Sequence, residues 1–334
     1  MRSIAMSAAG ASLFLLGILA ISDGRPSAQA QAANTLSIGI VTWIGYGPLF
    51  VGDQKGFFKR RGLNLSIKIM DDPGVREAAY AGGQIDLLPN TPDSLLILAA
   101  NGPDRDLKGR IVLALDESLG ADGVVAKSSI SKVGDLKGKN VGFQKGITSH
   151  FFLLYLLDKA GLGPNDITQV DLDAGAAFVA GRLDAAVTWE PWLSQAKADP
   201  QSRLLATSAD TPGLLADVLL ASNAALAKRA LICAFVDGWF ESVQFLQTNR
   251  SESSDIIARA FKLESKEVMN MLQTTHFFDR DQARNFLSDR NGSMNYFEAL
   301  RLSGRLFQLA SVIREIPDLS KLVDRGFMDG SHCR

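Results

Sequence analysis

Sulfur and imidazole are scarce in this chain, whose 334 residues include two cysteines and three histidines. Two cysteines are too few for the disulfide framework that small secreted domains use. Cys233 lies in an apolar helical segment, and Cys333 is the next-to-last residue of a polar tail. The sequence therefore allows a disulfide between them but does not predict one.

Motifs of catalysis and metal binding are absent as well. His150, His276 and His332 show no metal-ligand spacing, and a packed or solvated role is favoured for His150. The chain has no Gly-x-Ser-x-Gly, no Gly-x-x-x-x-Gly-Lys-[Ser/Thr], and no Gly-x-Gly-x-x-Gly after a strand. We therefore predict a protein that binds rather than an enzyme, without metal or cofactor.

Charge of either sign is not in excess. Lys and Arg number 35, Asp and Glu number 36, and the net charge is −1. This balance gives no electrostatic reason to expect nucleic acid or an anionic membrane surface as a partner. The apolar content of 46% indicates a globular protein with a large core, and the length favours two domains.

Long apolar runs are confined to the N-terminus. Arg2 precedes a nearly apolar run at residues 8–21, and Ala28-Gln29-Ala30 is a small-x-small cleavage pattern. We predict that residues 1–30 are a signal peptide and that the mature chain is periplasmic. The apolar run is short for a transmembrane helix, and no later run is longer.

Beyond the predicted signal, strands alternate with helices. Apolar strands are expected at residues 36–41, 63–70, 85–88, 111–115 and 140–143, and helices at 49–61, 74–81, 92–100 and 148–160. We expect Thr148 or Ser149 to cap the last of these helices. This alternation through short loops predicts an α/β fold with mostly parallel sheets. From Asn223 onward the pattern is helical, and the aromatic residues there are predicted to lie in the core.

The alternating pattern occurs twice. Gly62 and Gly83 in the first half correspond to Gly161 and Gly181 in the second, with spacings that agree to within one residue. We interpret the two halves as lobes of like topology that enclose a cleft.

In open α/β sheets, ligands bind beyond the carboxyl ends of the strands. The candidate contacts at these ends are Thr42, Trp43, Tyr46, Asn90, Asp93, Asp116, Glu117, Thr148, Ser149, Trp189 and Glu190. The four carboxylates in this set outnumber the one base found at a strand end, Lys145. Indole rings and carboxylates together favour a cationic or neutral nitrogen-bearing solute.

Four segments together resemble a known family: GYGP at residues 45–48, GFFKRRGL at 56–63, DLKGKNVG at 135–142 and DAAVTWEPW at 184–192. They are similar to the solute-binding proteins of nitrate/sulfonate/taurine-type ABC importers. The resemblance covers roughly residues 36–327. In that family the ligand contacts come from positions that correspond here to Thr42, Trp43, Tyr46, Thr148, Ser149, Trp189 and Glu190.

The resemblance implies the two-lobed fold of type II periplasmic binding proteins with a helical C-terminal region. Lobe 1 would comprise residues 35–119 with 223–327, and lobe 2 residues 120–222. Hinges are expected near residues 116–123 and 208–217, where Gly and Pro suit bends. A monomer of this kind would close on a small solute and deliver it to a membrane permease.

Family ligands include nitrate, sulfonates, bicarbonate, thiamine precursors and urea- or guanidine-like compounds. The acidic strand ends lead us to expect a guanidine, amine or pyrimidine, with an oxyanion such as sulfonate, taurine, nitrate or bicarbonate as the alternative. A pyrimidine-synthase-like enzyme using Lys145 and His150 is a second alternative, although the cysteine-rich motif of such enzymes is absent. A sensor domain that signals to a membrane kinase is a third.

Overall fold

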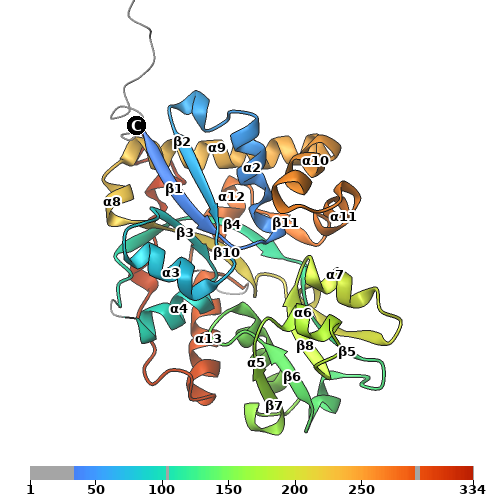
Figure 1. Cartoon of the computed structure of the whole chain (residues 1–334). Helices are drawn as coiled ribbons and strands as arrows, with labels where there is room; N and C mark the ends of the chain where they lie inside the picture. Colours follow the sequence, from blue (N-terminus) through green and yellow to red (C-terminus); the bar gives the residue numbers. More distant parts are fainter. Residues whose placement is uncertain (1–33, 103–104, 290–293, 334) are drawn as a thin grey trace, which may run out of the picture. The chain divides into compact units, whose positions relative to one another are not determined.

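Two β-sheets organise the described part of the chain, residues 34–102, 105–289 and 294–333, in this computed structural model (Figure 1). The predicted signal peptide lies outside these residues. No helix within them is long and apolar enough to cross a membrane.

The first sheet has the strand order β11-β4-β10-β3-β1-β2. Its strands are β1 (Thr35–Ile40), β2 (Asn64–Ile69), β3 (Leu87–Asn90), β4 (Gly109–Ser118), β10 (Ala216–Ser222) and β11 (Thr275–Phe277). Strand β1 pairs in parallel with β2 and β3, whereas β10 runs antiparallel between β3 and β4. The apolar residues of β1 are fully buried at Leu36, Ile38 and Ile40.

The second sheet has the order β7-β6-β8-β5-β9. It contains β5 (Asp122–Lys127), β6 (Asn140–Phe143), β7 (Thr168–Asp171), β8 (Ala185–Trp189) and β9 (Ser202–Thr207). Strand β6 pairs in parallel with β7 and β8, and β5 is antiparallel to β8 and β9. The predicted α/β fold with two sheets is confirmed, but the expectation of mostly parallel sheets was wrong. Both sheets are mixed, because β10, β11, β5 and β9 join them through antiparallel pairings.

The internal repeat is visible in the topology. The order β2-β1-β3 in one sheet matches β7-β6-β8 in the other. Helices α2 (Gly47–Gln54) and α3 (Pro73–Ala81) follow β1 and β2, as α5 (Thr148–Lys159) and α6 (Ala174–Val179) follow β6 and β7. Gly62 and Gly161 have φ angles of 78° and 72°, a left-handed conformation that favours glycine after a helix. The matched glycines therefore mark equivalent turns of two like units.

The chain passes between the sheets twice. It leaves the first sheet after β4, enters the second at β5, and returns between β9 and β10. The two crossings are joined by the hydroxyl groups of Ser118 and Ser208, whose oxygens are 2.6 Å apart. Residues 116–118, which we expected in a hinge, still belong to β4, and the bend follows at Gly120 with a φ angle of 115°. The assignment of whole lobes to residue ranges stays a prediction.

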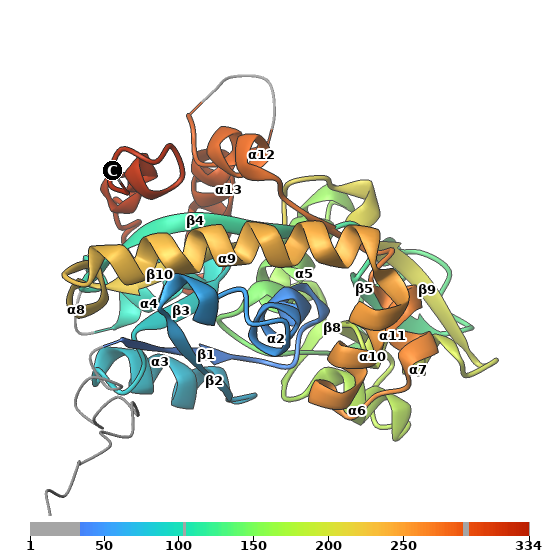
Figure 2. The same cartoon turned by 90° about the horizontal axis from the view of Figure 1, so that it is seen from above.

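Helices of the C-terminal part cover the first sheet, and α9 (Arg229–Thr248) lies along β4 and β10 (Figure 2). Its Phe235 and Trp239 are fully buried, as predicted for core aromatics. Helices α8 (Asn223–Leu226), α10 (Arg250–Phe261), α11 (Ser265–Met271), α12 (Arg280–Phe286) and α13 (Tyr296–Leu309) complete this part. The expectation of helices alone was wrong at residues 275–277, because β11 pairs with β4 there.

The disulfide that the sequence allowed without predicting it is formed between Cys233 and Cys333. The C-terminal tail folds back: the His332 ring packs edge-on against Phe327, and its Nε2 lies 2.9 Å from Asp324 Oδ1. These contacts bring Cys333 to α9, with a Cα–Cα distance of 5.7 Å to Cys233. The turn that positions the tail gives no periodic signal in the sequence.

Candidate functional site

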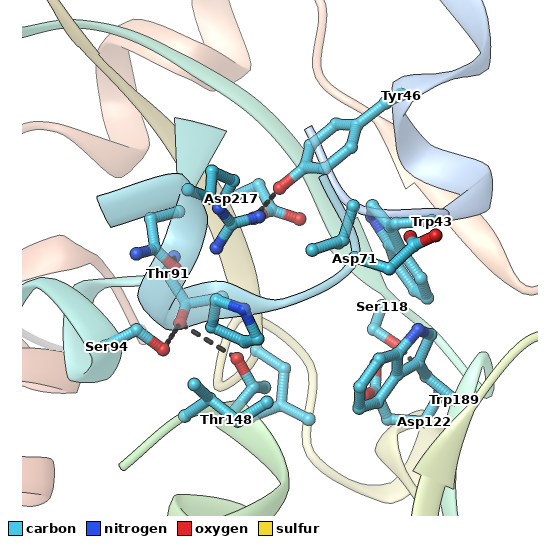
Figure 3. Close-up of a pocket in the computed structure, with 16 residues that line it drawn as sticks. Trp43, Tyr46, Asp71, Thr91, Ser94, Ser118, Asp122, Thr148, Trp189 and Asp217 are labelled. Carbon is cyan, nitrogen blue, oxygen red and sulfur yellow. Dashed lines mark hydrogen bonds between the residues drawn. The ribbon is translucent and has the colours of Figure 1, made fainter. Parts of the chain in front are cut away.

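A cavity of about 70 Å³ lies where the ends of β1, β3 and β4 face the start of α5 and the end of β8 (Figure 3). We call it the inner cavity. Its volume accommodates roughly five water-sized groups at ~10–15 Å³ each. Its lining residues are Val41, Trp43, Tyr46, Asp71, Pro73, Arg76, Asn90, Thr91, Ser94, Ser118, Asp122, Ile147, Thr148, Trp189, Leu215 and Asp217.

A second cavity of about 340 Å³, the outer chamber, shares Val41, Asp71 and Trp189 with the inner cavity. Its other lining residues are Thr42, Gln144, Asp173, Pro191, Trp192, Gln195, Phe261 and Leu263. Trp189 therefore stands between a small inner space and a larger outer one.

Six of the eleven predicted contacts line these cavities. Trp43, Tyr46, Asn90, Thr148 and Trp189 line the inner cavity, and Thr42 lines the outer chamber. Asp93, Asp116, Glu117, Ser149 and Glu190 line neither.

Two indole rings are held by hydrogen bonds at their nitrogens. Trp43 Nε1 donates to Asp116 Oδ1 at 3.3 Å, and Trp189 Nε1 donates to the carbonyl oxygen of Thr42 at 3.3 Å. The second bond links the second sheet to the loop after β1. A Cβ at Gly45 would lie 2.1 Å from Trp43 Nε1 and 2.5 Å from Asp116 Oδ1, so only glycine permits this packing.

Arg76 is a cavity residue that the sequence analysis missed. It lies in α3, is 3% exposed, and lines the inner cavity. Its Nε has no hydrogen-bond partner, and its guanidinium forms no ion pair within the described residues. A buried charge without a partner is costly. Such a group is suited to receive a hydrogen-bond acceptor from a ligand.

The negative charge of Asp217 offsets part of the positive charge of Arg76, although the two side chains form no ion pair. The Tyr46 hydroxyl donates to Asp217 Oδ1 at 2.9 Å. Burial raises the pKa of Asp217 to about 6, while the Tyr46 hydroxyl and the nearby Arg76 act in the other direction. Burial and the adjacent Asp217 also raise the pKa of Tyr46 well above its usual value, so the phenol stays a donor.

Two helix N-termini meet at the inner cavity. The hydroxyl oxygens of Thr91 and Thr148 lie 2.9 Å apart, and Thr91 also contacts the Ser94 hydroxyl at 2.9 Å. Neither α4 (Pro92–Asn101) nor α5 has a side-chain cap. The predicted capping of α5 was wrong, because Ile147 occupies the N-cap and Thr148 is the first helical residue. The positive ends of two helix dipoles therefore face the cavity beside Arg76.

Buried carboxyl groups lie on both sides of the inner cavity, with Asp217 and Asp93 near Arg76 and the start of α4, and Asp122 beside Trp189. Asp122 and Asp217 line the inner cavity and are each 7% exposed, and Asp93 and Asp116 lie behind its wall. Burial raises the pKa of Asp93 and Asp122 to about 7 and that of Asp116 well above its usual range. One oxygen each of Asp93 and Asp116 has no hydrogen-bond partner.

Three of the predicted contacts, Glu190, Ser149 and Glu117, form hydrogen bonds that stabilise the fold instead. Glu190 accepts hydrogen bonds from the backbone N–H and the hydroxyl of Ser194, at 2.9 and 2.8 Å, in α7 (Trp192–Lys197). The Ser149 hydroxyl bonds to the backbone of Gln144. These side chains satisfy local backbone groups and so do not face a solute.

Glu117 likewise belongs to the crossings between the sheets. Its carboxylate accepts from the Gly213 N–H at 2.6 Å and lies 2.8 Å from His276 Nδ1. The hydrogen bond to Glu117 raises the pKa of His276.

His150 is part of the core. Its ring stacks on Phe143 with a centroid distance of 4.8 Å, and its Nδ1 accepts from the Gly146 N–H at 3.3 Å. Burial lowers its pKa to about 4, so the ring is neutral near pH 7. Neither His150 nor Lys145 lines a cavity described above.

Comparison with known proteins identifies the family of this chain. Residues 43–253 match the family model described as NMT1/THI5 like. The chain is 24% identical over 237 residues to a Brucella abortus protein named as a candidate binding protein, covering 67% of this chain and 70% of that one. It is 27% identical over 174 residues to the taurine-binding periplasmic protein of Escherichia coli, covering 51% and 52% of the two chains.

A solved structure is similar over most of the chain. The alkanesulfonate-binding protein SsuA from Xanthomonas axonopodis pv. citri, bound to MOPS, has a TM-score of 0.71 and 25% identity, covering 87% of this chain and 98% of that one. The resemblance inferred from the sequence motifs is thereby confirmed. This chain belongs to the NMT1/THI5-like family and has the periplasmic-binding-protein fold of the sulfonate-binding protein to which it is similar.

Proposed function

We propose that this protein captures a small solute with a sulfonate or similar oxyanion group in the inner cavity and delivers it to the permease of an ABC importer. The observation that carries this proposal is the buried guanidinium of Arg76, which has no ion-pair partner in the described residues. The adjacent N-termini of α4 and α5 supply further positive potential.

The relatives support the oxyanion over the cationic or neutral nitrogen compound that the sequence favoured. One is named for taurine, and another was solved with MOPS, and both compounds are sulfonates. The sequence argument counted only bases directly after strands and so omitted Arg76. Charge-assisted hydrogen bonds to an oxyanion contribute ~1.5–3 kcal/mol each, enough for two or three to fix a small solute.

Capture would proceed by closure of the two sheets on the solute. Trp189–Thr42 and Thr91–Thr148 already link elements of the two sheets across the cavities. A solute held by Arg76 on one side and by α5 on the other binds the closed state better, because only closure completes its contacts. A shift from 1:99 to 99:1 in favour of closure requires about 5.5 kcal/mol of differential binding.

The cellular setting is part of the same proposal. The taurine-binding relative is named as periplasmic, so we propose periplasmic residence, monomeric action and transfer to a membrane permease. The pyrimidine-synthase-like alternative would need His150 at the substrate, and its packing between Phe143 and Phe307 favours a structural role.

A thermal-shift screen of the mature chain tests the function. Candidate solutes are taurine, propane-1-sulfonate, nitrate, bicarbonate, guanidine and a pyrimidine, and titration calorimetry then gives affinities for those that raise the Tm. We expect a sulfonate to give the largest shift. Stabilisation by guanidine or a pyrimidine alone would overturn the oxyanion assignment.

Arg76→Met provides the matched variant. We expect it to weaken sulfonate binding by about 100-fold, because charge-assisted hydrogen bonds are lost. Arg182→Met is the control, since Arg182 is exposed and lines neither cavity. Equal affinities of the two variants would contradict the role of Arg76.

A further inference from the structure

We propose that α13 is a strut that holds the start of α5 to the first sheet, so that the two sheets separate at the outer chamber and not along α5. Phe307 is the positioning residue of this strut. It acts through α5, whose first residue, Thr148, lines the inner cavity. The inference rests on the closure proposed above but not on the identity of the solute.

Helix α13 is anchored on the side of the first sheet. It packs against α4, which follows β3 (Figure 1). The side chain of Asn295 caps the helix by accepting from the N–H groups of Phe297 and Glu298 at 3.0 and 3.1 Å. The buried Tyr296 hydroxyl donates to the carbonyl oxygen of Leu319 at 3.3 Å. We therefore expect α13 to move together with the first sheet.

The same helix reaches the second sheet through a row of aromatic rings. The Phe307 ring centroid lies 5.6 Å from that of His150 and 6.1 Å from that of Phe151, both in the first turn of α5. His150 in turn stacks on Phe143 of β6 at 4.8 Å. All four side chains are at most 1% exposed. Separating α13 from α5 would expose these rings to water, which is unfavourable.

Two further contacts of the start of α5 lie with α4. The hydroxyl oxygens of Thr91 and Thr148, at the N-termini of α4 and α5, are 2.9 Å apart. A Cβ at Gly146, in the turn before α5, would lie 3.4 Å from Ile97 Cγ2 of α4. The first turn of α5 is therefore held by two helices of the first-sheet side.

The outer chamber lies away from the strut. In Figure 2, α13 is on the same side of the molecule as β4, and α6, α7 and α10 are on the opposite side. There, the volume of about 340 Å³ has Phe261, the last residue of α10, and Trp192 of α7 in its lining. The hydrogen bond from Trp189 Nε1 to the Thr42 carbonyl connects the two sheets on this side. Water can replace one hydrogen bond at small net cost, but it cannot replace contacts between buried rings.

The strut adds a third connection to the two crossings of the chain. The buried hydroxyl groups of Ser118, at the end of β4, and Ser208 join these crossings. A hinge motion that preserves the crossings and the strut widens the side away from them, where the outer chamber lies.

Distances measured by pulsed electron–electron double resonance on the ligand-free mature chain test this inference. One pair of spin labels spans the strut, at Leu309→Cys of α13 and Lys159→Cys of α5. The other spans the outer chamber, at Lys266→Cys of α11 and Ala198→Cys at the end of α7. All four residues are exposed, and the native cysteines are bonded to each other and so do not take the label.

We expect a narrow distance distribution across the strut and a broader one across the outer chamber. Equal widths, or a broader distribution across the strut, would overturn the inference. This comparison uses the native Phe307 and decides the inference even if a variant of Phe307 folds poorly.

Variants test the role of Phe307 itself. Phe307→Ala should broaden the distribution across the strut and weaken taurine binding about tenfold, because fewer molecules then hold α5 in its binding position. Phe307→Leu refills most of the volume and should restore both quantities toward the wild type. The control is Tyr296→Phe, which removes a buried hydrogen bond of the same helix and should alter neither.

A strut distribution in Phe307→Ala as narrow as in the wild type would rule out the positioning role. Broadening by Tyr296→Phe as large as that by Phe307→Ala would rule it out as well. If taurine and the other sulfonates fail to bind the wild-type chain, the proposed solute class fails, and the distances still decide this inference.

Discussion

Position directly after a strand does not decide whether a polar side chain lines the cavity, as Glu190 and Arg76 show. Glu190 follows a strand directly, yet its carboxylate is used by the N–H and hydroxyl of Ser194. Arg76 lies inside α3, yet it lines the cavity without a partner for its Nε. Position at a strand end predicted Trp43, Tyr46, Thr148 and Trp189 as lining residues. It does not show which polar side chains will instead form hydrogen bonds with nearby backbone groups. The position of Pro73 could have pointed to Arg76. Pro73 starts α3 just after a strand, so the first turn of α3, which contains Arg76, lies near the cavity.

Replacing Trp189 tests the aromatic wall. Trp189→Ala should weaken sulfonate binding about tenfold or more, because an indole face and a link between the sheets are lost. The Tm of the ligand-free protein should change little, since Trp189 is only partly buried. Titration calorimetry and thermal unfolding measure both quantities. Trp239→Ala is the contrast: this fully buried side chain should cost ~3–5 kcal/mol of stability. A comparable loss for Trp189→Ala would mean that Trp189 is a core residue.

Replacing Glu190 tests its structural role. Glu190→Ala should lower the free energy of unfolding by about 1–2 kcal/mol, because Ser194 loses two hydrogen bonds near the start of α7. Sulfonate affinity should stay within about twofold, since Glu190 lines neither cavity. Urea unfolding and calorimetry give the two numbers. Unchanged stability with a large loss of affinity would return Glu190 to the ligand site.

At the scale of elements, the repeated strand and helix order was predictable because local signals carry it. Buried strands are continuous apolar runs, and Gly62, Gly83, Gly161 and Gly181 mark turns with positive φ. Pairings distant in sequence were not predictable: β10 inserts antiparallel between β3 and β4, and β11 adds to the edge of β4. Such pairings depend on tertiary packing, which no short window of sequence contains.

The disulfide is the clearest tertiary feature that can be removed. Cys333→Ser should lower the free energy of unfolding by about 2–4 kcal/mol, because the bond links residues 100 positions apart and restricts the unfolded chain. Urea unfolding under non-reducing conditions measures the loss. Cys233→Ser should give a similar loss, and the double variant little more, because one bond is removed in each case. Single variants as stable as the wild type would contradict a structural role for the bond.

For the whole molecule, the buried acids make stability depend on pH. Burial raises the pKa of Asp93 and Asp122 to about 7 and of Asp217 to about 6, above the value of ~3.9 in an unfolded chain. Stability from such groups is fully present below pH ~4 and is lost as pH rises through the folded-state pKa. The raised pKa of His276 acts in the same direction.

We therefore expect the ligand-free protein to lose stability between pH 5 and pH 8. Urea unfolding at intervals across this range measures the slope. Asp122→Asn should reduce the slope, because one titrating group is removed, whereas Asp173→Asn should not. A stability that rises with pH over this range would contradict the burial of the acids.

The central claim is that a sulfonate occupies the inner cavity between the two sheets. The most direct measurement is X-ray diffraction from crystals of the mature chain grown with taurine. We expect the sulfonate oxygens within hydrogen-bonding distance of Arg76 and Thr148, and the solute enclosed by Trp43 and Trp189. Taurine bound only in the outer chamber or on the surface, with the inner cavity free of it, would contradict the account.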